Sequence, residues 1–239
     1  MVLNPCTRKF NVFTDTAVQY KGTGKGCFAS YGFGHDACVE DYKVVKIFSF
    51  KQVEGIYENM VKVYSLKAKS WKVVQGFNNG YITAKMAIFA NGVLHWEAYS
   101  GDTWEIVTYD LGSERIGKIG LPNYGDKGIC WTLGVSSGYL VGCCNYESNK
   151  ADVWMMKKYA FEKSWTKLVT VSSLVHCWAH ISPLFVTENG DQVLLRIDAK
   201  LMLYNSREGS LKQFDDFEAG DFCQVHVATY FESLALPHI

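Results

Sequence analysis

Apolar residues along this chain recur in short runs that alternate with polar residues and end at turn-forming residues. Four places share one pattern, in which two apolar or aromatic anchors are separated by seven residues. The anchor pairs are Leu3 with Phe10, Tyr64 with Trp71, Tyr109 with Ile116, and Tyr204 with Leu211. A fifth segment, Asp152 to Trp165, has the same character with a longer connection. Alternation over short runs bounded by turn residues predicts β-hairpins at these places.

A glycine-containing turn between apolar runs precedes three of these hairpins. The turns are Asn91-Gly92, Ser137-Gly138 and Asn189-Gly190, and Asn and Gly tolerate the positive φ that tight hairpin turns require. Each unit therefore reads strand, turn, strand, loop, strand, turn, strand. The anchors Tyr64, Tyr109, Trp154 and Tyr204 follow one another at intervals of 45, 45 and 50 residues, and four strands per ~40–50 residues is the period of a β-propeller blade.

The predicted fold is therefore all-β: a β-propeller-like (kelch-like) array of four-stranded antiparallel blades in one domain, residues 1–239. A single blade cannot bury both of its faces, so we expect aromatic residues at matched positions to pack between blades. These residues are Tyr64, Trp71, Tyr109, Trp154 and Trp165; the alternative is an exposed aromatic cage for a ligand. The array is either incomplete or closed by pairing of the terminal strands, with Phe222 to Phe231 against the opening hairpin.

Composition narrows the range of partners. Lys+Arg and Asp+Glu both number 24, so the net charge of zero favours neither nucleic acid nor a membrane as partner. No apolar run reaches the ~18 residues of a membrane-spanning helix, and the N-terminus lacks the pattern of a signal peptide. The 8 cysteines form no C-x-x-C pair, which predicts free thiols and a cytoplasmic or nuclear location.

Four segments could suggest chemistry, and the sequence favours an ordinary structural role for each. His176 and His180 have a metal-ligand spacing but no third ligand nearby. The adjacent pair Cys143-Cys144 would point to opposite faces of a strand and cannot easily share a metal. Gly22 to Gly26 lacks the spacing of a phosphate-binding loop, and the acidic run Asp215 to Glu218 is typical of a solvated loop. We predict no catalytic, cofactor-binding or metal-binding residues, and no cofactor.

The repeat also carries a family resemblance. Asn4-Pro5-Cys6-Thr7-Arg8 resembles the opening signature of plant F-box-associated interaction domains. Further matches follow in the order of that family, from the first hairpins to the C-terminus. They are Tyr31–Asp36, Asp41–Lys46, Val63–Leu66 with Ser70-Trp71, Asn91–Trp96, Tyr109–Leu111, Leu121-Pro122, Asp152–Met156 with Ser164–Leu168, and Tyr230–Leu234. The ordered set runs across essentially the whole chain. The family that it resembles includes pollen F-box proteins of self-incompatibility and regulators of immune receptors, and the motifs assign the chain to neither subgroup.

The resemblance implies the substrate-recognition module of an SCF-type (cullin–RING) ubiquitin ligase, which is not itself an enzyme. It implies a protein substrate as partner, and a Skp-type adaptor and cullin only if an F-box lies upstream. These 239 residues contain no helical, Leu-rich F-box, so we expect a fragment or a truncated product. The alternatives are a truncated member without function and a propeller hydrolase. Binding normally uses loops on a rigid scaffold; the candidate segments are residues 11–30, 50–60 and 76–85, with no individual contact residue assigned.

Overall fold

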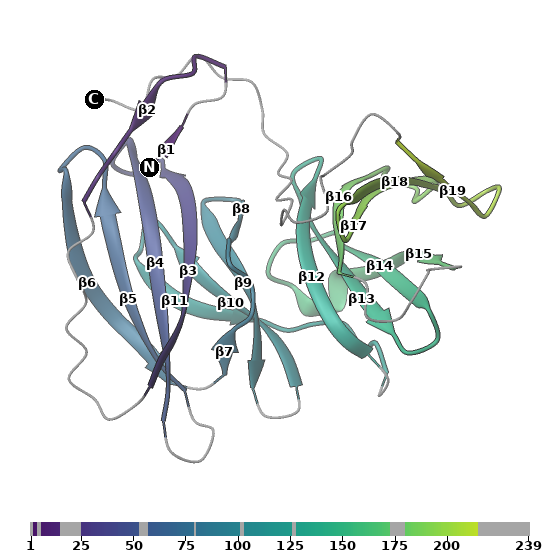
Figure 1. Cartoon of the computed structure of the whole chain (residues 1–239), viewed down its shortest axis with the longest axis horizontal. Coiled ribbons are helices and arrows are strands. Elements are labelled where there is room, and N and C mark those ends of the chain that lie inside the picture. The colour runs from purple at the N-terminus through teal and green to yellow at the C-terminus, as the bar shows by residue number, and fades with distance from the viewer. Residues whose placement is uncertain are drawn as a thin grey trace. The chain divides into compact units, whose positions relative to one another are not determined.

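The structure is a computed structural model that describes residues 2–3, 6–14, 25–52, 57–78, 80–100, 103–125, 128–172 and 180–214. Within these ranges the chain forms β-strands and a single 3₁₀ turn, Glu162–Ser164, with no α-helix (Figure 1). The described part also contains no helix that is long and apolar enough to cross a membrane. The prediction of an all-β fold is confirmed.

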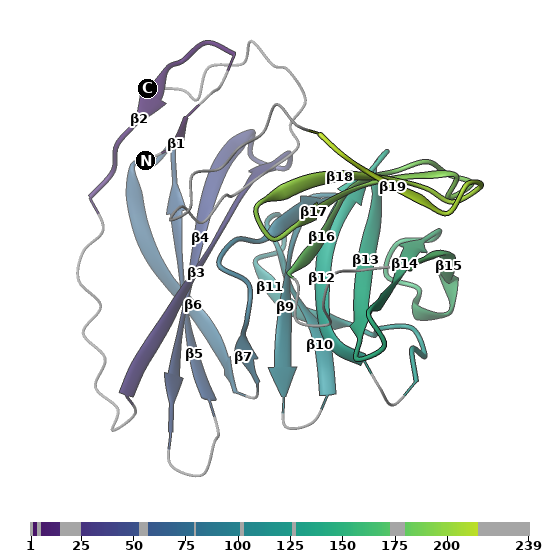
Figure 2. The same ribbon diagram turned by 45° about the vertical axis from the view of Figure 1, so that its right-hand side comes forward.

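The strands follow the predicted repeat of four antiparallel strands in chain order (Figures 1 and 2). The first sheet contains β3 (Lys25–Asp36), β4 (Asp41–Lys51), β5 (Tyr57–Ser65) and β6 (Ser70–Asn78). The second contains β7 (Tyr81–Ile82), β8 (Ile88–Ala90), β9 (Val93–Ser100), β10 (Thr103–Asp110) and β11 (Arg115–Ile119). Here β7 and β8 both pair with β9, so two short strands take the place of one inner strand.

The remaining sheets continue the same order. The third contains β12 (Gly128–Ser136), β13 (Tyr139–Tyr146), β14 (Lys150–Met156) and β15 (Trp165–Val171). The fourth contains β16 (Ile181–Val186), β17 (Gln192–Ile197), β18 (Lys200–Asn205) and β19 (Ser210–Gln213). The opening hairpin is a two-stranded ladder of β1 (Val2–Leu3) and β2 (Phe10–Asn11).

The seven-residue spacing of the anchors has a direct structural cause. Leu3 with Phe10, Tyr64 with Trp71, and Tyr204 with Leu211 are register partners on neighbouring strands. A polar residue follows the first anchor and caps the turn: the Ser65 hydroxyl oxygen accepts the N–H of Ala68 at 2.8 Å. The same capping is made by Asp110 and Asn205. Short polar side chains in this place satisfy backbone groups that a turn leaves unpaired.

The next residue of the repeat ties the outer hairpin to the inner one. The N–H of Leu66 donates to the carbonyl of Tyr42 (3.0 Å), and that of Leu111 donates to Gly92 (3.2 Å). The N–H of Ser206 makes the equivalent bond to Asp191 in the fourth sheet. In the recurring Tyr-(Ser/Asp/Asn)-(Leu/Ser) sequence, the first residue is therefore the anchor and the second caps the turn. The third residue bonds the outer hairpin to the inner one.

The chain divides into two compact units, and the first holds the opening hairpin and most of the first two sheets. Its core lies between these sheets: Val45, Ile47 and Val63 face Leu94 and the fully buried Trp96. The other members of this cluster are Val61, Ile82, Ala98, Val107, Tyr109 and Leu111. The alternation of β4 and β5 thus places one apolar face against the second sheet.

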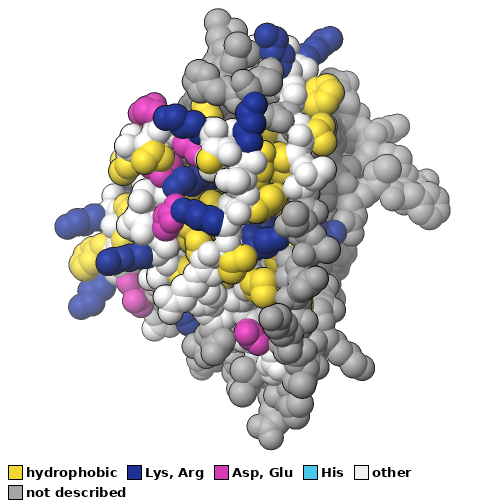
Figure 3. Space-filling model, turned by 90° about the vertical axis from the view of Figure 1, so that its left-hand side faces the viewer, with side chains coloured by type: hydrophobic (Ala, Val, Ile, Leu, Met, Phe, Trp, Pro, Cys, Tyr) yellow, Lys and Arg dark blue, Asp and Glu magenta, His cyan; other side chains and the backbone are white. Residues whose placement is uncertain are grey.

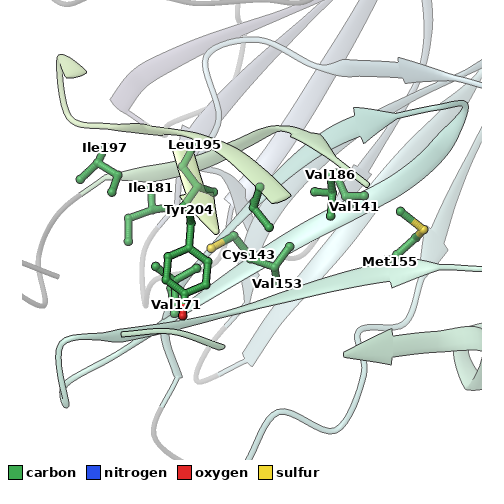
Figure 4. Close-up of a cluster of buried hydrophobic side chains, with 12 residues drawn as sticks. Val141, Cys143, Val153, Met155, Val171, Ile181, Val186, Leu195, Ile197 and Tyr204 are labelled. Atoms are coloured by element: carbon green, nitrogen blue, oxygen red, sulfur yellow. The ribbon is translucent and has the colours of Figure 1, made fainter. Parts of the chain in front are cut away.

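The second unit holds most of residues 119–229, and its core lies between the third and fourth sheets. Figure 4 shows side chains of β13 and β14, among them Cys143 and Met155, facing Val186 and Leu195. Cys144 is also buried but lies on the other face of β13, as the sequence predicted for adjacent strand residues. Burial raises the pKa of Cys144 to about 12 and that of Cys143 well above its usual value.

The five aromatic residues expected to pack between blades have different surroundings, and Trp154 is half-buried with Lys167 Nζ 5.9 Å from its ring centroid. Tyr109 and Tyr204 lie between sheets of their own units, and Trp165 is buried with its Nε1–H donating to the carbonyl of Gly120 at 2.9 Å. Tyr64 and Trp71 instead pack with Phe13, whose ring stacks on Tyr64 at 4.6 Å between centroids. The alternative of an exposed cage is wrong for the anchors that are buried.

Several predictions fall outside the described residues and stay predictions. They concern the pairing of Phe222 to Phe231 with the opening hairpin, the acidic run Asp215 to Glu218, most of Gly22 to Gly26, and His176.

Candidate interaction site

Three four-residue turns of the first unit form what we call the turn rim: residues 37–40, 66–69 and 111–114. Each turn ends in a residue with positive φ that is not glycine: Glu40 (51°), Lys69 (51°) and Glu114 (56°). A side chain in this backbone region costs roughly 1 kcal/mol relative to glycine. The turns therefore present charged side chains at positions where the backbone would prefer glycine.

The first two turns are tied to each other through Asp41. One carboxylate oxygen of Asp41 accepts the backbone N–H of Lys67 at 2.9 Å, and the other accepts the hydroxyl of Ser65. In return, the Lys67 ammonium donates to the carbonyl of Val39 at 3.2 Å. These bonds link the turn at 37–40 to the turn at 66–69.

The third turn is held by a buried lysine. The Nζ of Lys43 donates to Asp36 Oδ2 (2.6 Å), to the carbonyl of Leu111 (2.9 Å) and to Glu114 Oε1 (3.0 Å). An ammonium group has three donors, so each has a partner here. The Lys43 and Asp36 side chains are 7% and 1% exposed, and the network joins the first sheet to the second.

Neighbouring charges and hydrogen bonds favour the ionised forms of Asp36, Lys43 and Glu114. Burial opposes ionisation of Asp36, but hydrogen bonds from Lys43 and from the backbone outweigh burial, so the pKa of Asp36 is lowered. For Lys43 burial again opposes the charge, and hydrogen bonds to Asp36 and Glu114 raise its pKa. The pKa of Glu114 is lowered in the same way, with burial opposed by Lys72 and Lys43.

Beside this network lies a shallow cleft of about 300 Å³, which we call the lysine cleft. It is lined by Val39, Asp41, Lys43, Val63, Ser65, Ala68, Ser70, Lys72 and Glu114. Val39 is 52% exposed, and Lys72 donates to Glu114 Oε2 at 2.6 Å from a half-exposed position. The cleft thus combines an exposed apolar residue with charged groups on a hydrogen-bonded frame, an arrangement suited to a protein partner.

Figure 3 shows the side of the molecule on which β5 and β6 lie in Figure 1. Hydrophobic side chains there lie between basic and acidic ones, and no single sign of charge covers the face. Such mixed surfaces suit protein partners better than nucleic acid.

The described parts of the three segments that the sequence predicts to bind a partner lie away from the lysine cleft. Residues 50–60 and 76–85 include the ends of β4 and β6, which are opposite to the turn rim because neighbouring strands are antiparallel. Asn59 orders this end: its Nδ2 donates to the carbonyl of Gly80 at 3.1 Å. Within residues 11–30, Phe13 and Thr14 contact Tyr64 and Trp71. Sequence reasoning missed the lysine cleft, although charged residues recur at the turn positions of the first two sheets.

The structure describes some of the histidines and cysteines that the sequence analysis considered as metal ligands. His180 is exposed, and its Nδ1 lies 2.9 Å from a guanidinium nitrogen of Arg196. In the described part of the chain no three His, Cys, Asp or Glu residues gather to hold a metal ion. Five cysteines of the described part are free thiols: Cys6, Cys38, Cys130, Cys143 and Cys144.

The fold and its repeat define a propeller-type array of antiparallel sheets, and comparison with known proteins gives its family. The family model described as "F-box associated beta propeller domain" matches residues 1–236. The chain therefore belongs to the F-box associated β-propeller domain family, which confirms the resemblance seen in the sequence.

Curated relatives come from Arabidopsis thaliana. F-box/kelch-repeat protein At3g23880 is 32% identical over 77% of this chain and 50% of its own length. F-box protein CPR1 is 29% identical (82% and 54%), and F-box protein At4g22390 is 30% identical (88% and 58%). The chain thus spans about half the length of the curated relatives it matches. Among solved structures, an oligogalacturonate lyase from Vibrio parahaemolyticus matches with a TM-score of 0.43 at 10% identity, over 82% of this chain and 55% of its own.

Proposed function

We propose that this chain is the substrate-recognition module of an SCF-type ubiquitin ligase and binds a target protein for ubiquitination. The observation that carries the proposal is the family match over residues 1–236, together with relatives named as F-box proteins. In this arrangement the chain supplies binding and no catalytic residue. An F-box in the full-length protein would contact a Skp-type adaptor and, through it, the cullin. We propose a cytoplasmic or nuclear location for this complex.

The lysine cleft is the surface that we propose for the target protein. Its three turns are joined by hydrogen bonds before any partner arrives, so binding there orders little additional backbone. Exposed Val39 and Ala68 provide apolar contact beside the charged Lys72. Apolar residues within a polar border are typical of protein interfaces.

The proposal is tested by affinity capture from plant extract, with this chain and with a form extended upstream to include any encoded F-box. We expect only the extended form to recover a Skp-type adaptor and a cullin, and both forms to recover the same candidate targets. Recovery of no ligase component by the extended form would contradict the ligase role.

The surface is tested in the same experiment with two matched variants. Val39→Arg places a bulky cation in the lysine cleft, whereas Val73→Arg changes a valine of β6 that is 65% exposed. We expect Val39→Arg to lose the targets while both variants keep the adaptor. Equal target recovery by the two variants would exclude the lysine cleft as the binding surface.

A further inference from the structure

The outer hairpin of the third sheet departs from the turn length of the repeat. It joins β14 to β15 through residues 157–164, because Met156 and Trp165 are register partners. The equivalent turns of the other three sheets have four residues each: 66–69, 111–114 and 206–209. In a repeat array, insertions in single repeats form loops that often lie on the binding face. We call residues 157–164 the basic loop.

Hydrogen bonds within the basic loop fix its backbone. The Ser164 hydroxyl accepts the N–H of Lys158 at 3.0 Å and donates to the carbonyl of the same residue at 2.7 Å. The N–H of Lys157 donates to the carbonyl of Ser164 at 3.2 Å. Phe161 donates its N–H to the carbonyl of Lys158 (3.2 Å) and accepts the N–H of Ser164 (2.8 Å). A partner that binds this loop therefore has little additional backbone to order.

This ordered loop exposes one aromatic ring and three cations. Phe161 is 49% exposed, and Lys157, Lys158 and Lys163 are exposed as well. The Nζ of Lys158 lies 5.5 Å from the ring centroid of Phe161. A single exposed phenylalanine is ordinary on a protein surface. A ring beside several cations on a fixed backbone instead offers a partner apolar contact and charge at one place.

The positive charge of the basic loop is not matched by nearby carboxylates. Within the described part of the chain, none of its three lysines forms an ion pair. Lys157 Nζ donates instead to the backbone carbonyl of Glu188 at 3.3 Å, which leaves its charge without a counter-ion. The loop has one acidic residue, Glu162, whose carboxylate lies against Gly120. A local excess of positive charge therefore lies on a chain whose net charge is zero, and it attracts carboxylates.

Three classes of partner carry negative charge, and the loop suits one of them best. A basic cluster that recognises anionic lipids usually contains about 4–8 Lys or Arg residues, more than the three of this loop. Nucleic acid is disfavoured because the chain as a whole has no positive charge to attract it. An acidic protein segment that also carries an apolar side chain matches both the cations and the ring.

We propose that the basic loop binds an acidic segment of a partner protein, in which carboxylates flank an apolar side chain. The carboxylates pair with Lys157, Lys158 and Lys163, and the apolar side chain packs on Phe161. The inference goes beyond the substrate-recognition role and does not rest on it, since the loop belongs to the second unit and the lysine cleft to the first.

Selection from a displayed library of random peptides, with the whole chain as bait, tests the proposal. We expect the selected peptides to be enriched in Asp and Glu next to an apolar residue. The dissociation constant of one selected peptide is then measured by fluorescence polarisation. Its affinity should fall as the salt concentration rises, because salt screens pairs of exposed charges.

Two loop variants separate the contribution of the ring from that of the charges. Phe161→Ser and the double variant Lys158→Glu/Lys163→Glu should each weaken peptide binding at least about tenfold. All three side chains are exposed, so the substitutions leave the core of the second unit intact.

Each loop variant has a matched control in the second unit. Phe185→Ser removes a phenylalanine of β16 that is 44% exposed, and Lys150→Glu/Lys200→Glu reverses two exposed lysines outside the loop. Both controls should bind the selected peptide within about twofold of the natural chain, since they leave the contacting groups unchanged.

Several results would overturn the proposal. Selected peptides without acidic enrichment, or full affinity in either loop variant, would exclude an acidic segment at this loop. Loss of binding in Val39→Arg, with both loop variants unchanged, would place the acidic peptides in the lysine cleft instead. Flotation of the whole chain with vesicles of phosphatidylcholine and phosphatidylserine, lost in Phe161→Ser and unaccompanied by acidic peptides in the selection, would assign the loop to a membrane surface.

Discussion

Substitution of Lys43 by methionine gives the sharpest test of how the first unit is held together. Methionine keeps most of the apolar stem and removes the ammonium group that bonds to Asp36, Leu111 and Glu114. The Asp36 side chain is 1% exposed, so the variant leaves a buried carboxylate without its cation. Removing one partner of a buried ion pair typically costs about 3–5 kcal/mol in unfolding free energy.

Lys72→Met is the matched control, because it removes the other lysine of the same network. The Lys72 side chain is 53% exposed and that of Glu114 is 29% exposed, and pairs with one solvated partner contribute about 0–1 kcal/mol. We therefore expect the two variants to differ by at least about 2 kcal/mol, although each removes one lysine bonded to Glu114.

Native-state hydrogen exchange is the appropriate assay, because two compact units need not unfold in a single step. The slowest amides of β4 and β5 should exchange more than about a hundredfold faster in Lys43→Met, since 1.4 kcal/mol corresponds to a factor of ten. Amides of β13 and β14 in the second unit serve as the internal reference and should keep their rates.

The pH dependence adds a second condition. The pKa values of Asp36 and Glu114 are lowered from 3.8 and 4.5 on folding, so their ionised forms stabilise the native chain above those values. This contribution is lost as the pH falls through the lowered pKa values of the folded state. Without Lys43, burial instead favours protonated Asp36, so acid should narrow the difference between the variant and the natural chain. Similar exchange rates for Lys43→Met and Lys72→Met at pH 7, or a difference that widens toward pH 4, would refute this reasoning.

Three further predictions concern other parts of the fold. Gly134→Ala should destabilise the second unit by about 3 kcal/mol, measured by hydrogen exchange, because a Cβ there would overlap the backbone carbonyl of Pro183. Burial lowers the pKa of His95 from 6.5 to about 4, so the natural chain should lose about 3 kcal/mol of unfolding free energy as the pH falls from 6.5 to about 4. In urea unfolding measured over this pH range, His95→Gln should lose less unfolding free energy. An equal loss in both chains would contradict the buried neutral histidine. Alkylation at pH 8 followed by mass spectrometry should label exposed Cys38 quickly and buried Cys143 only after unfolding, whereas equal rates would contradict its burial.

The repeat could be predicted because its signal is local. A seven-residue anchor spacing such as Tyr64 to Trp71 specifies a four-residue turn and a register, and Asn91-Gly92 supplies the positive φ values of a tight hairpin. Both are properties of neighbouring residues in the chain, so no knowledge of tertiary contacts is needed.

The lysine network could not be predicted, because its members meet only after two sheets have packed. Lys43 and Glu114 are 71 residues apart, and each taken alone resembles an ordinary exposed charge. The splitting of the inner strand of the second sheet into β7 and β8 was also not foreseen. The segment around Met86 between them instead pairs with Tyr31 of β3, a long-range contact with no local signature.

The positive φ values of Glu40, Lys69 and Glu114 have a consequence for how this surface could change. The equivalent turn between β18 and β19 ends in Gly209 at a φ of 62°, so the same backbone can be formed without a side chain. Turn geometry and surface chemistry are therefore separable at Glu40 and Lys69, where a charge can be added, removed or reversed while the strands keep their register, whereas Glu114 is also bonded to the buried Lys43. A scaffold of this kind can acquire a different partner by single substitutions, because the backbone strain that glycine would relieve, roughly 1 kcal/mol, is largely offset by the greater freedom of glycine in the unfolded chain.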